Sequence, residues 1–456
     1  NTEILTQIFL KISLRKFLDK IMKKDKTIYV PMGADILHSG HLNIIKEAKK
    51  YGKIVIGLFT DKAIAEYKSL PLINYRQRLE VMENLKDIHK IVKQDTWSYK
   101  TNLNKMKPNY VIHGDDWQNG IQKNIRLEVI KTLKKWNGKL IEVPYTKNSS
   151  LLKNQSKAKK TFFTPMSRVS RFRRLLETQK IVRFIECHNP LVGLLAEKLS
   201  INLKNEFREF HGLWSSSLTD SASQGKPDNQ SVELTTRINN LNNVIEVTNK
   251  PILFDADNGG RPEHLPYTIK NLERLGVSAI AIEDKIGLKS NSLFKDQSRA
   301  NQDTIKNFCR KIKIACNARH SNDFLIVARI ESFILGQDLN DALKRAENFS
   351  KAGADLILIH SKIDTPKEIF AFAKKFKKSK YYKPLVAVPS TYSSVKEEEL
   401  ISSGFKVVIY ANHLLRAAYP AMEKVALEIL KNKRSFEIEK KIISIKKILN
   451  IIPPVE

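Results

Sequence analysis

The apolar run 279–282 ends in two carboxylates, and the loop that follows carries lysine, asparagine and serine side chains. The residues are Glu283, Asp284, Lys285, Lys289, Asn291 and Ser292. A buried strand that ends in carboxylates and continues into a basic, amide-bearing loop is typical of a site for a metal ion and a phosphate group. We therefore expect the second half of the chain to be a scaffold for this stretch.

More carboxylates follow a neighbouring apolar run. Asp255 and Asp257 are two residues apart after the run 251–254, so a strand would place both on one face, and Glu283 comes from the next run. Oxygen donors without clustered cysteine or histidine favour magnesium, which keeps several waters and binds few carboxylates directly. The sequence therefore predicts an Mg²⁺ set of Asp255, Asp257 and Glu283.

A pair of histidines is the chemical feature of the first half. His38 and His41 flank Gly40 in a loop that follows the apolar run 27–31 and leads into a helical pattern. Backbone N–H groups at a helix N-terminus already favour an anion, and two imidazoles there can contact the same phosphate. We expect an anion site at this loop.

Composition narrows the class of protein. The chain has 456 residues, of which 42% are hydrophobic and 28% charged, so two soluble globular domains are expected. No stretch approaches the roughly 20 apolar residues that a membrane helix needs. Three cysteines without disulfide or zinc spacing (Cys187, Cys309 and Cys316) favour a reducing, cytoplasmic location.

The formal net charge of +31 raises the alternative of a nucleic-acid-binding protein on a degenerate enzyme scaffold. Its lysines are spread along the whole chain, however, and no basic motif is interleaved with aromatic residues. A lysine-biased surface around sites for anionic substrates is the preferred interpretation, with neither nucleic acid nor a membrane as a partner.

The segment 26–145 alternates apolar strands with helical patterns. Strands are predicted at 27–31, 53–59, 88–92, 110–113 and 139–143, with helices near 41–50, 75–86, 99–106 and 121–136. This alternation predicts an α/β fold with a doubly wound, Rossmann-like parallel sheet. Such sheets bind ligands at the carboxyl ends of their strands.

Eight further β-like runs, each followed by a helical pattern, occupy the second half: 181–186, 209–213, 251–254, 279–282, 324–328, 355–359, 385–388 and 407–410. This count predicts a (β/α)₈ barrel, whose active site lies at the C-terminal ends of the strands. Polar residues follow the runs, among them His188, Trp214 to Ser217, Arg329, Glu331, His360, Ser390 and Asn412.

The predicted organisation has four parts. They are an N-terminal helical extension at 1–25, a nucleotidyltransferase-like domain at 26–152, a Lys/Ser/Arg-rich linker at 153–178 and a barrel with C-terminal helices at 179–456.

The stretch from Gly33 to His41 contains an HxGH motif, and residues 26–152 resemble the cytidylyltransferase family. The resemblance implies CTP as a co-substrate, with catalytic His38 and His41 stabilising charge on the α-phosphoryl group. It also implies nucleotide contacts from Gly40, Lys68, Arg78, Asp115, Ser149 and Ser150. The family's Gly-Ile-Ser-Ser-Thr-like turn is represented here by 146–151, which keeps the serines but lacks the glycine and the final threonine.

Residues 180–432 resemble phosphoenolpyruvate mutase, a member of the isocitrate lyase superfamily. The resemblance rests on the Trp214–Ser221 stretch, Asp255-Ala256-Asp257, Arg329, His360 and, above all, Glu283-Asp284-Lys285 followed after five residues by Asn291-Ser292. It implies Mg²⁺ on Asp255, Asp257 and Glu283, and catalytic Asp228, Lys289, Asn291, Arg329 and His360. Substrate contacts are implied for Trp214, Ser216, Ser217, Leu218, Lys285 and Ser292, and a homodimer or homotetramer is expected.

Together the two resemblances predict a bifunctional enzyme of phosphonate biosynthesis. The barrel would interconvert phosphoenolpyruvate and 3-phosphonopyruvate, and the N-terminal domain would transfer CMP from CTP to a phosphonate such as 2-aminoethylphosphonate. Two alternatives on the same barrel stay open, a phosphonopyruvate hydrolase and a C–C lyase, either with an inactive nucleotidyltransferase domain.

Overall fold

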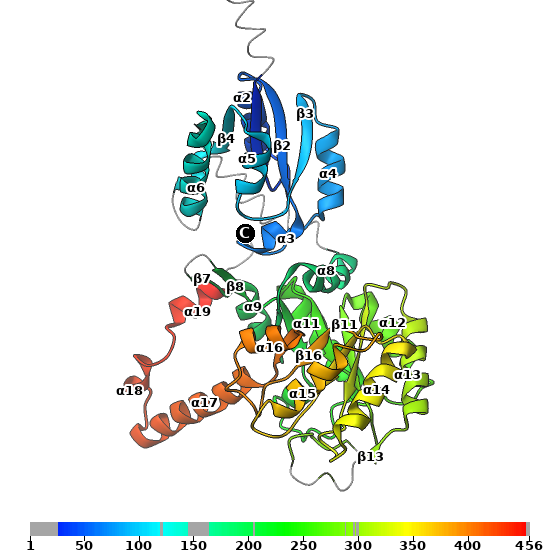
Figure 1. Ribbon diagram of the computed structural model, residues 1–456. Helices are drawn as coiled ribbons and strands as arrows, with labels where there is room; N and C mark the ends of the chain where they lie inside the picture. Colours follow the sequence, from blue (N-terminus) through cyan, green and yellow to red (C-terminus); the bar gives the residue numbers. More distant parts are fainter. Residues whose placement is uncertain are drawn as a thin grey trace, which may run out of the picture. The chain divides into compact units, whose positions relative to one another are not determined.

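The computed structural model describes residues 26–118, 122–144, 164–203, 206–287, 289–294, 297 and 301–452. The chain forms two compact units (Figure 1). The first comprises 1–167, 173–180 and 199–209, and the second comprises 168–172, 181–198 and 210–456. The predicted extension 1–25 and the part 153–163 of the predicted linker lie outside the described residues. The four predicted domain boundaries stay predictions.

The first unit contains a five-stranded parallel sheet in the order β3-β2-β1-β4-β5. The strands are β1 (Thr27–Met32), β2 (Lys53–Phe59), β3 (Ile88–Gln94), β4 (Tyr110–Gly114) and β5 (Lys139–Val143). The helices are α2 (Ser39–Ala48), α3 (Asp61–Ala65), α4 (Tyr75–Glu83), α5 (Lys100–Met106) and α6 (Lys123–Leu133). Apolar clusters fill both faces of the sheet, so the prediction of a doubly wound fold is confirmed.

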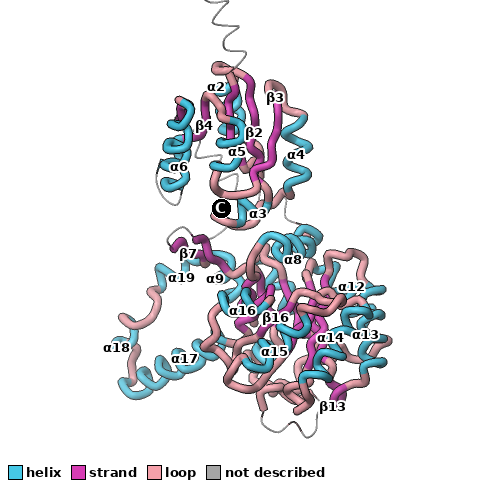
Figure 2. Tube along the Cα trace, viewed as in Figure 1, coloured by secondary structure: helices cyan, strands magenta, loops and turns pink. Residues whose placement is uncertain are grey.

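The second unit contains a closed barrel of eight parallel strands, in the order β6-β9-β10-β11-β14-β15-β16-β17. Figure 2 shows the strands inside a ring of helices. The strands are β6 (Val182–Glu186), β9 (Gly212–Ser215), β10 (Ile252–Asp255), β11 (Ala279–Glu283), β14 (Leu325–Ile330), β15 (Leu356–Ile359), β16 (Leu385–Ala387) and β17 (Phe405–Tyr410). The predicted (β/α)₈ barrel is therefore confirmed.

One barrel strand differs from its predicted position. The run 209–213 is split, because Glu206–Glu209 forms β8 in a separate hairpin with β7 (Ser200–Leu203), and the barrel strand begins only at Gly212. A Cβ atom at Gly212 would come within 2.3 Å of the Phe184 ring on the neighbouring strand. Glycine thus lets two strand backbones approach over a buried aromatic side chain.

The barrel helices are amphipathic, and most bury one apolar stripe against the strands. They are α9 (Pro190–Lys198), α10 (Ser217–Ala222), α11 (Leu234–Val247), α12 (Leu265–Leu275), α13 (Ile305–Ala318), α14 (Leu339–Ala352), α15 (Lys367–Phe376) and α16 (Glu397–Ser403). Gly276 and Gly353 end α12 and α14 with φ of 84° and 116°. These left-handed caps turn the chain into the next strand.

Helix α8 (Pro165–Thr178) lies in the segment predicted as a linker. Thr164 caps it by accepting a hydrogen bond from the Ser167 N–H, and Pro165 occupies the first turn, where a missing N–H costs nothing. Val169 is fully buried in the barrel core, and Arg168 donates to the Thr248 and Leu275 carbonyls. This part of the segment is therefore a packed helix.

The last barrel strand is followed by α17 (His413–Asn432), α18 (Phe436–Glu439) and α19 (Ile445–Ile451). None of the described side chains of α17 is buried, although Tyr419, Met422, Leu427 and Leu430 are apolar. In Figure 1 this red-orange segment runs away from the barrel. Within the part of the chain that the structure describes, no helix combines the length and the apolar composition needed to cross a membrane.

Candidate active sites

A small cavity of about 60 Å³ lies at the mouth of the barrel. Its wall is made of residues at or just after the carboxyl ends of strands, together with loop residues that cover them. The lining residues are Trp214, Ser216, Ser217, Leu218, Asp228, Asp255, Glu283, Lys289, Asn291, Ser292, Leu293, Arg329, Leu358, His360, Val388, Ser390, Ala411 and Asn412. Segments separated by up to about 200 residues are thus brought to one point, as the barrel topology requires.

Arg329 is the central cation of this cavity. Its Nε donates to Glu331 at 2.6 Å, and its Nη2 donates to the Ser292 hydroxyl at 2.9 Å and lies 3.4 Å from Glu283. His360 Nδ1 lies 3.1 Å from Arg329 Nη2 and 3.2 Å from Glu331. A partly buried arginine beside a buried histidine, both of which line the cavity, forms a suitable cradle for phosphoryl oxygens.

The loop after β11 contributes a second group of charges. Lys289 Nζ contacts Asp257, the Ser217 hydroxyl and, at 2.6 Å, Asp228. Asn291 Nδ2 donates to the other oxygen of Asp228 at 2.7 Å. Asp228 therefore holds both loop side chains at the wall of the cavity.

The predicted metal set fits a magnesium ion through two of its three carboxylates. Asp255 and Glu283 line the cavity, whereas Asp257 contacts Lys289 and faces a neighbouring cavity. Among the described residues, no three His, Cys, Asp or Glu side chains converge on one position. Burial, together with nearby Glu331, raises the pKa of Glu283 to about 7 against the opposing effect of Arg329. A cation at this carboxylate would supply the missing charge compensation, and Mg²⁺ needs few direct protein ligands.

The first unit has a larger cavity, of about 230 Å³, beside the start of α2. His38 caps this helix, because its Nδ1 accepts from the Gly40 N–H at 3.1 Å, while His41 Nδ1 accepts from the His38 N–H at 3.3 Å. In the neutral rings the proton is therefore assigned to Nε2, which makes each ring a donor. Burial, with His38 and Lys68 nearby, lowers the pKa of His41 to about 4, so this ring is neutral at pH 7.

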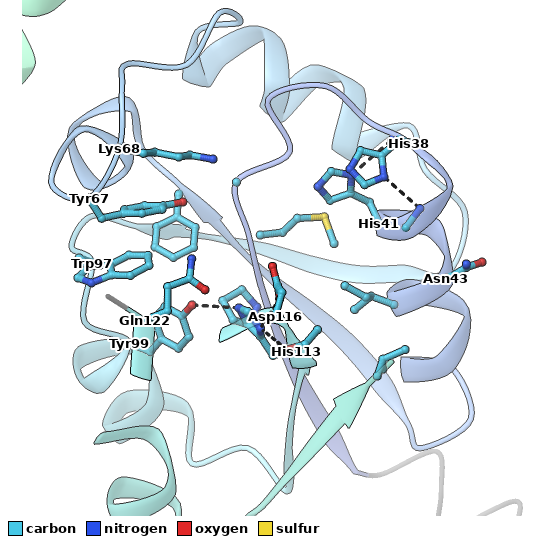
Figure 3. A pocket seen from close by; sticks show the side chains of 18 of the residues that line it. His38, His41, Asn43, Tyr67, Lys68, Trp97, Tyr99, His113, Asp116 and Gln122 are labelled. Atoms are coloured by element: carbon cyan, nitrogen blue, oxygen red, sulfur yellow. Dashed lines mark hydrogen bonds and ion pairs between the residues drawn. The ribbon is translucent and has the colours of Figure 1, made fainter. Parts of the chain in front are cut away.

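The opposite wall of this cavity is aromatic. Tyr67 and Trp97 stack with ring centroids 3.6 Å apart, next to Phe59 and Tyr99. Figure 3 shows Tyr67, Trp97 and Tyr99 on one side of the cavity, the two histidines on the other, and the Lys68 ammonium pointing between them. One end can therefore hold a phosphate group, and the other can hold a flat or cationic group.

Comparison with known proteins agrees with this geometry. Residues 172–430 match the family model described as phosphoenolpyruvate phosphomutase. The phosphoenolpyruvate phosphomutase of Tetrahymena pyriformis is 33% identical over 293 residues, which cover 64% of this chain and 93% of the relative. The chain belongs to the phosphoenolpyruvate phosphomutase family. It is an enzyme, and the best-matched part is the barrel.

Solved structures of relatives show the same barrel. A phosphoenolpyruvate phosphomutase from Streptomyces platensis subsp. rosaceus has a TM-score of 0.57 and 34% identity, over 62% of this chain and 94% of that one. A phosphonopyruvate hydrolase in complex with oxalate and Mg²⁺ has a TM-score of 0.55 and 32% identity over the same shares. The phosphonopyruvate hydrolase of Variovorax sp. (strain Pal2) is 33% identical over 288 residues, 63% of this chain and 95% of the relative. The relatives of this barrel are therefore named for two different reactions.

The N-terminal part has its own match. Residues 34–175 match the family model described as cytidylyltransferase-like. This range includes the HxGH loop, the aromatic wall and most of α8. The chain thus combines a phosphomutase-family barrel with a cytidylyltransferase-like unit, as the resemblances in the sequence predict.

Most residues predicted for the barrel site line the barrel cavity, but two of them, Asp257 and Lys285, do not. Asp257 faces a neighbouring cavity, and Lys285 is buried behind the wall, where it donates to the Ser292 hydroxyl at 2.8 Å. Asp284 points away and pairs with Arg345 at 3.0 Å. Ser390 and Asn412 line the cavity without having been predicted as site residues, although their positions after strands were the signal.

In the cytidylyltransferase-like unit, His38, Gly40, His41 and Lys68 line the cavity together. Arg78 does not: its guanidinium is buried and donates to the Gly33 and Ile73 carbonyls and to Asp61. The cavity is lined by Asp116 and not by the predicted Asp115, and Ser149 and Ser150 lie outside the described residues. Tyr67, Trp97 and Tyr99 come from loops and helix ends, where sequence spacing gave no signal.

Proposed function

We propose that the barrel interconverts phosphoenolpyruvate and 3-phosphonopyruvate. The phosphoryl group leaves the enol oxygen and bonds to C3, so the reaction needs no co-reactant but must exclude water. The observation that carries this proposal is the pairing of Lys289 and Asn291 with Asp228 beside a 60 Å³ cavity that contains Arg329 and His360. A cavity this small, covered by a pinned loop, suits an intermediate that water would destroy.

In this reaction Arg329 and His360 hold the phosphoryl oxygens. Trp214, Ser216, Ser217 and Leu218 line the cavity elsewhere, and α10 begins at Ser217. We assign these four residues to the carboxylate end of the substrate, through backbone N–H groups and hydroxyls. Lys289 and Asn291 keep the transferring group away from water.

We infer that the cofactor is Mg²⁺, which Asp255 and Glu283 would hold. When bound, this ion stabilises negative charge on the enolate oxygen of pyruvate. Asp257 supports the active site indirectly, because its carboxylate contacts the Lys289 ammonium. Ser217 supports the site by donating its hydroxyl to Asp255 at 3.0 Å.

The hydrolase relative defines the main rival, because the same cavity could pass the phosphoryl group to water. Phosphorus NMR of the protein with phosphonopyruvate and Mg²⁺ separates the possibilities. Phosphoenolpyruvate as the product supports the mutase, whereas free phosphate with pyruvate supports a hydrolase. Cleavage of a 2-alkylmalate-type substrate, with no reaction of phosphonopyruvate, would support a C–C lyase and reject both.

For the first unit we propose transfer of CMP from CTP to a phosphonate such as 2-aminoethylphosphonate. A phosphonate oxygen attacks the α-phosphorus, pyrophosphate leaves, and the Nε2–H groups of His38 and His41 stabilise the developing charge. The paired histidines at the start of α2 support this assignment. Protein that releases no pyrophosphate from CTP plus 2-aminoethylphosphonate contradicts it.

A homo-oligomer is proposed for the barrel. Helices α17 to α19 expose many apolar side chains, including Tyr419, Leu430, Phe436, Ile445 and Leu449, each more than 60% exposed. A patch of this kind marks a protein interface more often than a solvated surface. Light scattering after gel filtration should give a dimer or tetramer, and Leu430→Glu should shift it toward the monomer.

A reducing, cytoplasmic location is proposed from the cysteines. Cys187, Cys309 and Cys316 are all described, and none forms a disulfide. Burial raises the pKa of the Cys187 thiol to about 12, so it behaves as a small apolar side chain. Fluorescence microscopy of the tagged protein in its native cell would test this location.

A further inference from the structure

Glu331 lies just beyond β14, fully buried, and is not among the residues that line the barrel cavity. Three of its neighbours do line it: Arg329, His360 and Ser292. A fourth neighbour, Lys285, is buried behind the wall. Glu331 therefore touches the phosphoryl-binding side of the cavity from behind.

The Glu331 carboxylate has a full set of donors. Oε1 accepts from Arg329 Nε at 2.6 Å and lies 3.2 Å from His360 Nδ1. Oε2 accepts from the Ser292 hydroxyl at 2.5 Å and lies 3.3 Å from Lys285 Nζ. Two carboxylate oxygens offer about four lone-pair positions, so every position has a partner. Burial opposes ionisation, but Arg329, His360 and Lys285 hold the pKa of Glu331 well below its usual range.

The Ser292 hydroxyl also has a partner at each of its hydrogen-bonding positions. Its hydroxyl donates to Glu331 and accepts from Lys285 Nζ at 2.8 Å and from Arg329 Nη2 at 2.9 Å. A hydroxyl offers one donor and two acceptor positions, so its orientation is fixed by these three partners. The position of Ser292, at the end of the motif that begins with Glu283, is thereby tied to the position of Arg329.

We propose that Glu331 is a positioning residue, whose carboxylate orients Arg329, His360 and Ser292 toward the phosphoryl end of the substrate. This assignment rests on the proposed function of the barrel, but it concerns phosphoryl binding and not the identity of the product. It applies equally to a mutase and to a hydrolase.

The Glu331→Gln variant keeps the shape of the side chain and changes its hydrogen bonding. Glutamine has the size of glutamate, but it replaces one acceptor oxygen with an NH₂ group that only donates. In either orientation of the amide, that group faces two of the four existing donors. Arg329 and His360 should then reorient, and a misplacement of about 1 Å in a catalytic group can lower the rate on the order of 100-fold.

The experiment compares two ligands on the Mg²⁺-loaded full chain. Kinetics with phosphonopyruvate report on the phosphoryl end, whereas calorimetric binding of oxalate, which has no phosphoryl group, reports on the rest of the cavity. For Glu331→Gln we expect a loss of kcat/KM on the order of 100-fold, with the Kd of oxalate within about threefold of wild type, which is less than the loss of one typical hydrogen bond of about 1 kcal/mol. Glu273→Gln is the matched control, because Glu273 is a buried barrel carboxylate that accepts from the His320 and Ser321 N–H groups. It should change neither quantity by more than that threefold.

Two outcomes overturn the assignment. In the first, kcat/KM for phosphonopyruvate is the same in Glu331→Gln as in Glu273→Gln. In the second, Glu331→Gln weakens oxalate binding as much as it lowers kcat/KM, which would indicate general disruption of the cavity. If the Gln variant does not fold, Glu331→Asp keeps the charge, and its shorter side chain cannot reach all four donors, so the same selective loss is expected. Wild-type protein that binds oxalate but neither binds nor converts phosphonopyruvate would overturn the proposed function and this assignment together.

Discussion

Both cavities carry basic side chains, but different groups bind those side chains: carboxylates in the barrel and the backbone in the cytidylyltransferase-like unit. In the barrel, Arg329 and Lys289 pair with buried carboxylates, among them Glu331 and Asp228. In the cytidylyltransferase-like unit, His38 and His41 hydrogen-bond to the backbone, and the pKa of each is lowered, mainly by burial. The barrel cavity therefore holds several charged side chains before any substrate arrives, whereas the histidine pair of the other cavity is held toward its neutral form beside the Lys68 ammonium.

This difference determines what a substitution does. Removing one charge from the barrel leaves a buried partner uncompensated, so activity and stability should fall together. Removing a neutral histidine takes away a hydrogen-bond donor without stranding a charge, so activity should fall with little change in stability.

Arg329→Ala should have the largest effect. It removes the principal phosphoryl-binding cation and leaves Glu283 and Glu331 facing each other without it. We expect kcat/KM for phosphonopyruvate to fall on the order of 10³-fold and the free energy of unfolding to fall by about 3–5 kcal/mol. Phosphorus NMR and urea titration measure the two quantities. A variant that loses activity at wild-type stability would show that the barrel charges are not interdependent.

His38→Ala and His41→Ala should affect only the first unit. Each removes a donor to the α-phosphoryl group, so we expect CMP transfer to fall about 10²-fold in either variant. Conversion of phosphonopyruvate should be unchanged, and the free energy of unfolding should change by no more than about 1 kcal/mol. Pyrophosphate release, measured beside the NMR assay on the same preparation, checks both statements. Loss of both activities would contradict the independence of the two sites.

Much of this arrangement follows from sequence, because strand ends and short motifs are local features. Predicted β2 and β5 have the observed bounds, and residues at the carboxyl ends of β10, β11 and β14 (Asp255, Glu283 and Arg329) meet at the barrel mouth as expected. What the sequence left open is the direction of individual side chains. Asp284 follows Glu283 directly and pairs with Arg345, because successive side chains of an extended segment point to opposite faces.

The first unit shows the same limit. The motif that contains Arg78 was found, but its guanidinium is turned inward, because Gly33, Ile73 and Asp61 offer it a complete set of acceptors. Tyr67 and Trp97 stack across a separation of 30 residues between irregular segments. Neither periodicity nor spacing in the sequence encodes such a tertiary contact.

Asn291→Ala should have a moderate effect on the barrel. It removes the amide that donates to Asp228, while Lys289 keeps its own contact with that carboxylate. Loss of one hydrogen bond corresponds to roughly tenfold in rate, so we expect phosphoenolpyruvate formation to slow by about that factor and free phosphate to appear. The phosphorus NMR assay reports both products in one spectrum. An unchanged rate and product ratio would remove this amide from water exclusion.

At pH 7 the smallest effect is that of the histidine pair on stability, because it appears only as the pH falls. His41 has a folded-state pKa of about 4, below its ordinary value of 6.5, because of burial and the nearby His38 and Lys68. Its neutral form is favoured by folding, so the corresponding stability is present above pH 6.5 and is lost as the pH falls toward 4. A difference of this size corresponds to about 2–3 kcal/mol at the lower pH. His41→Asn, which retains an acceptor for the His38 N–H, should flatten the pH dependence of the free energy of unfolding between pH 6.5 and 4. A barrel variant that removes no charge, such as Asn291→Ala, should leave this pH dependence unchanged, and a flattened profile in that variant would assign the low-pH loss of stability to the barrel cavity instead.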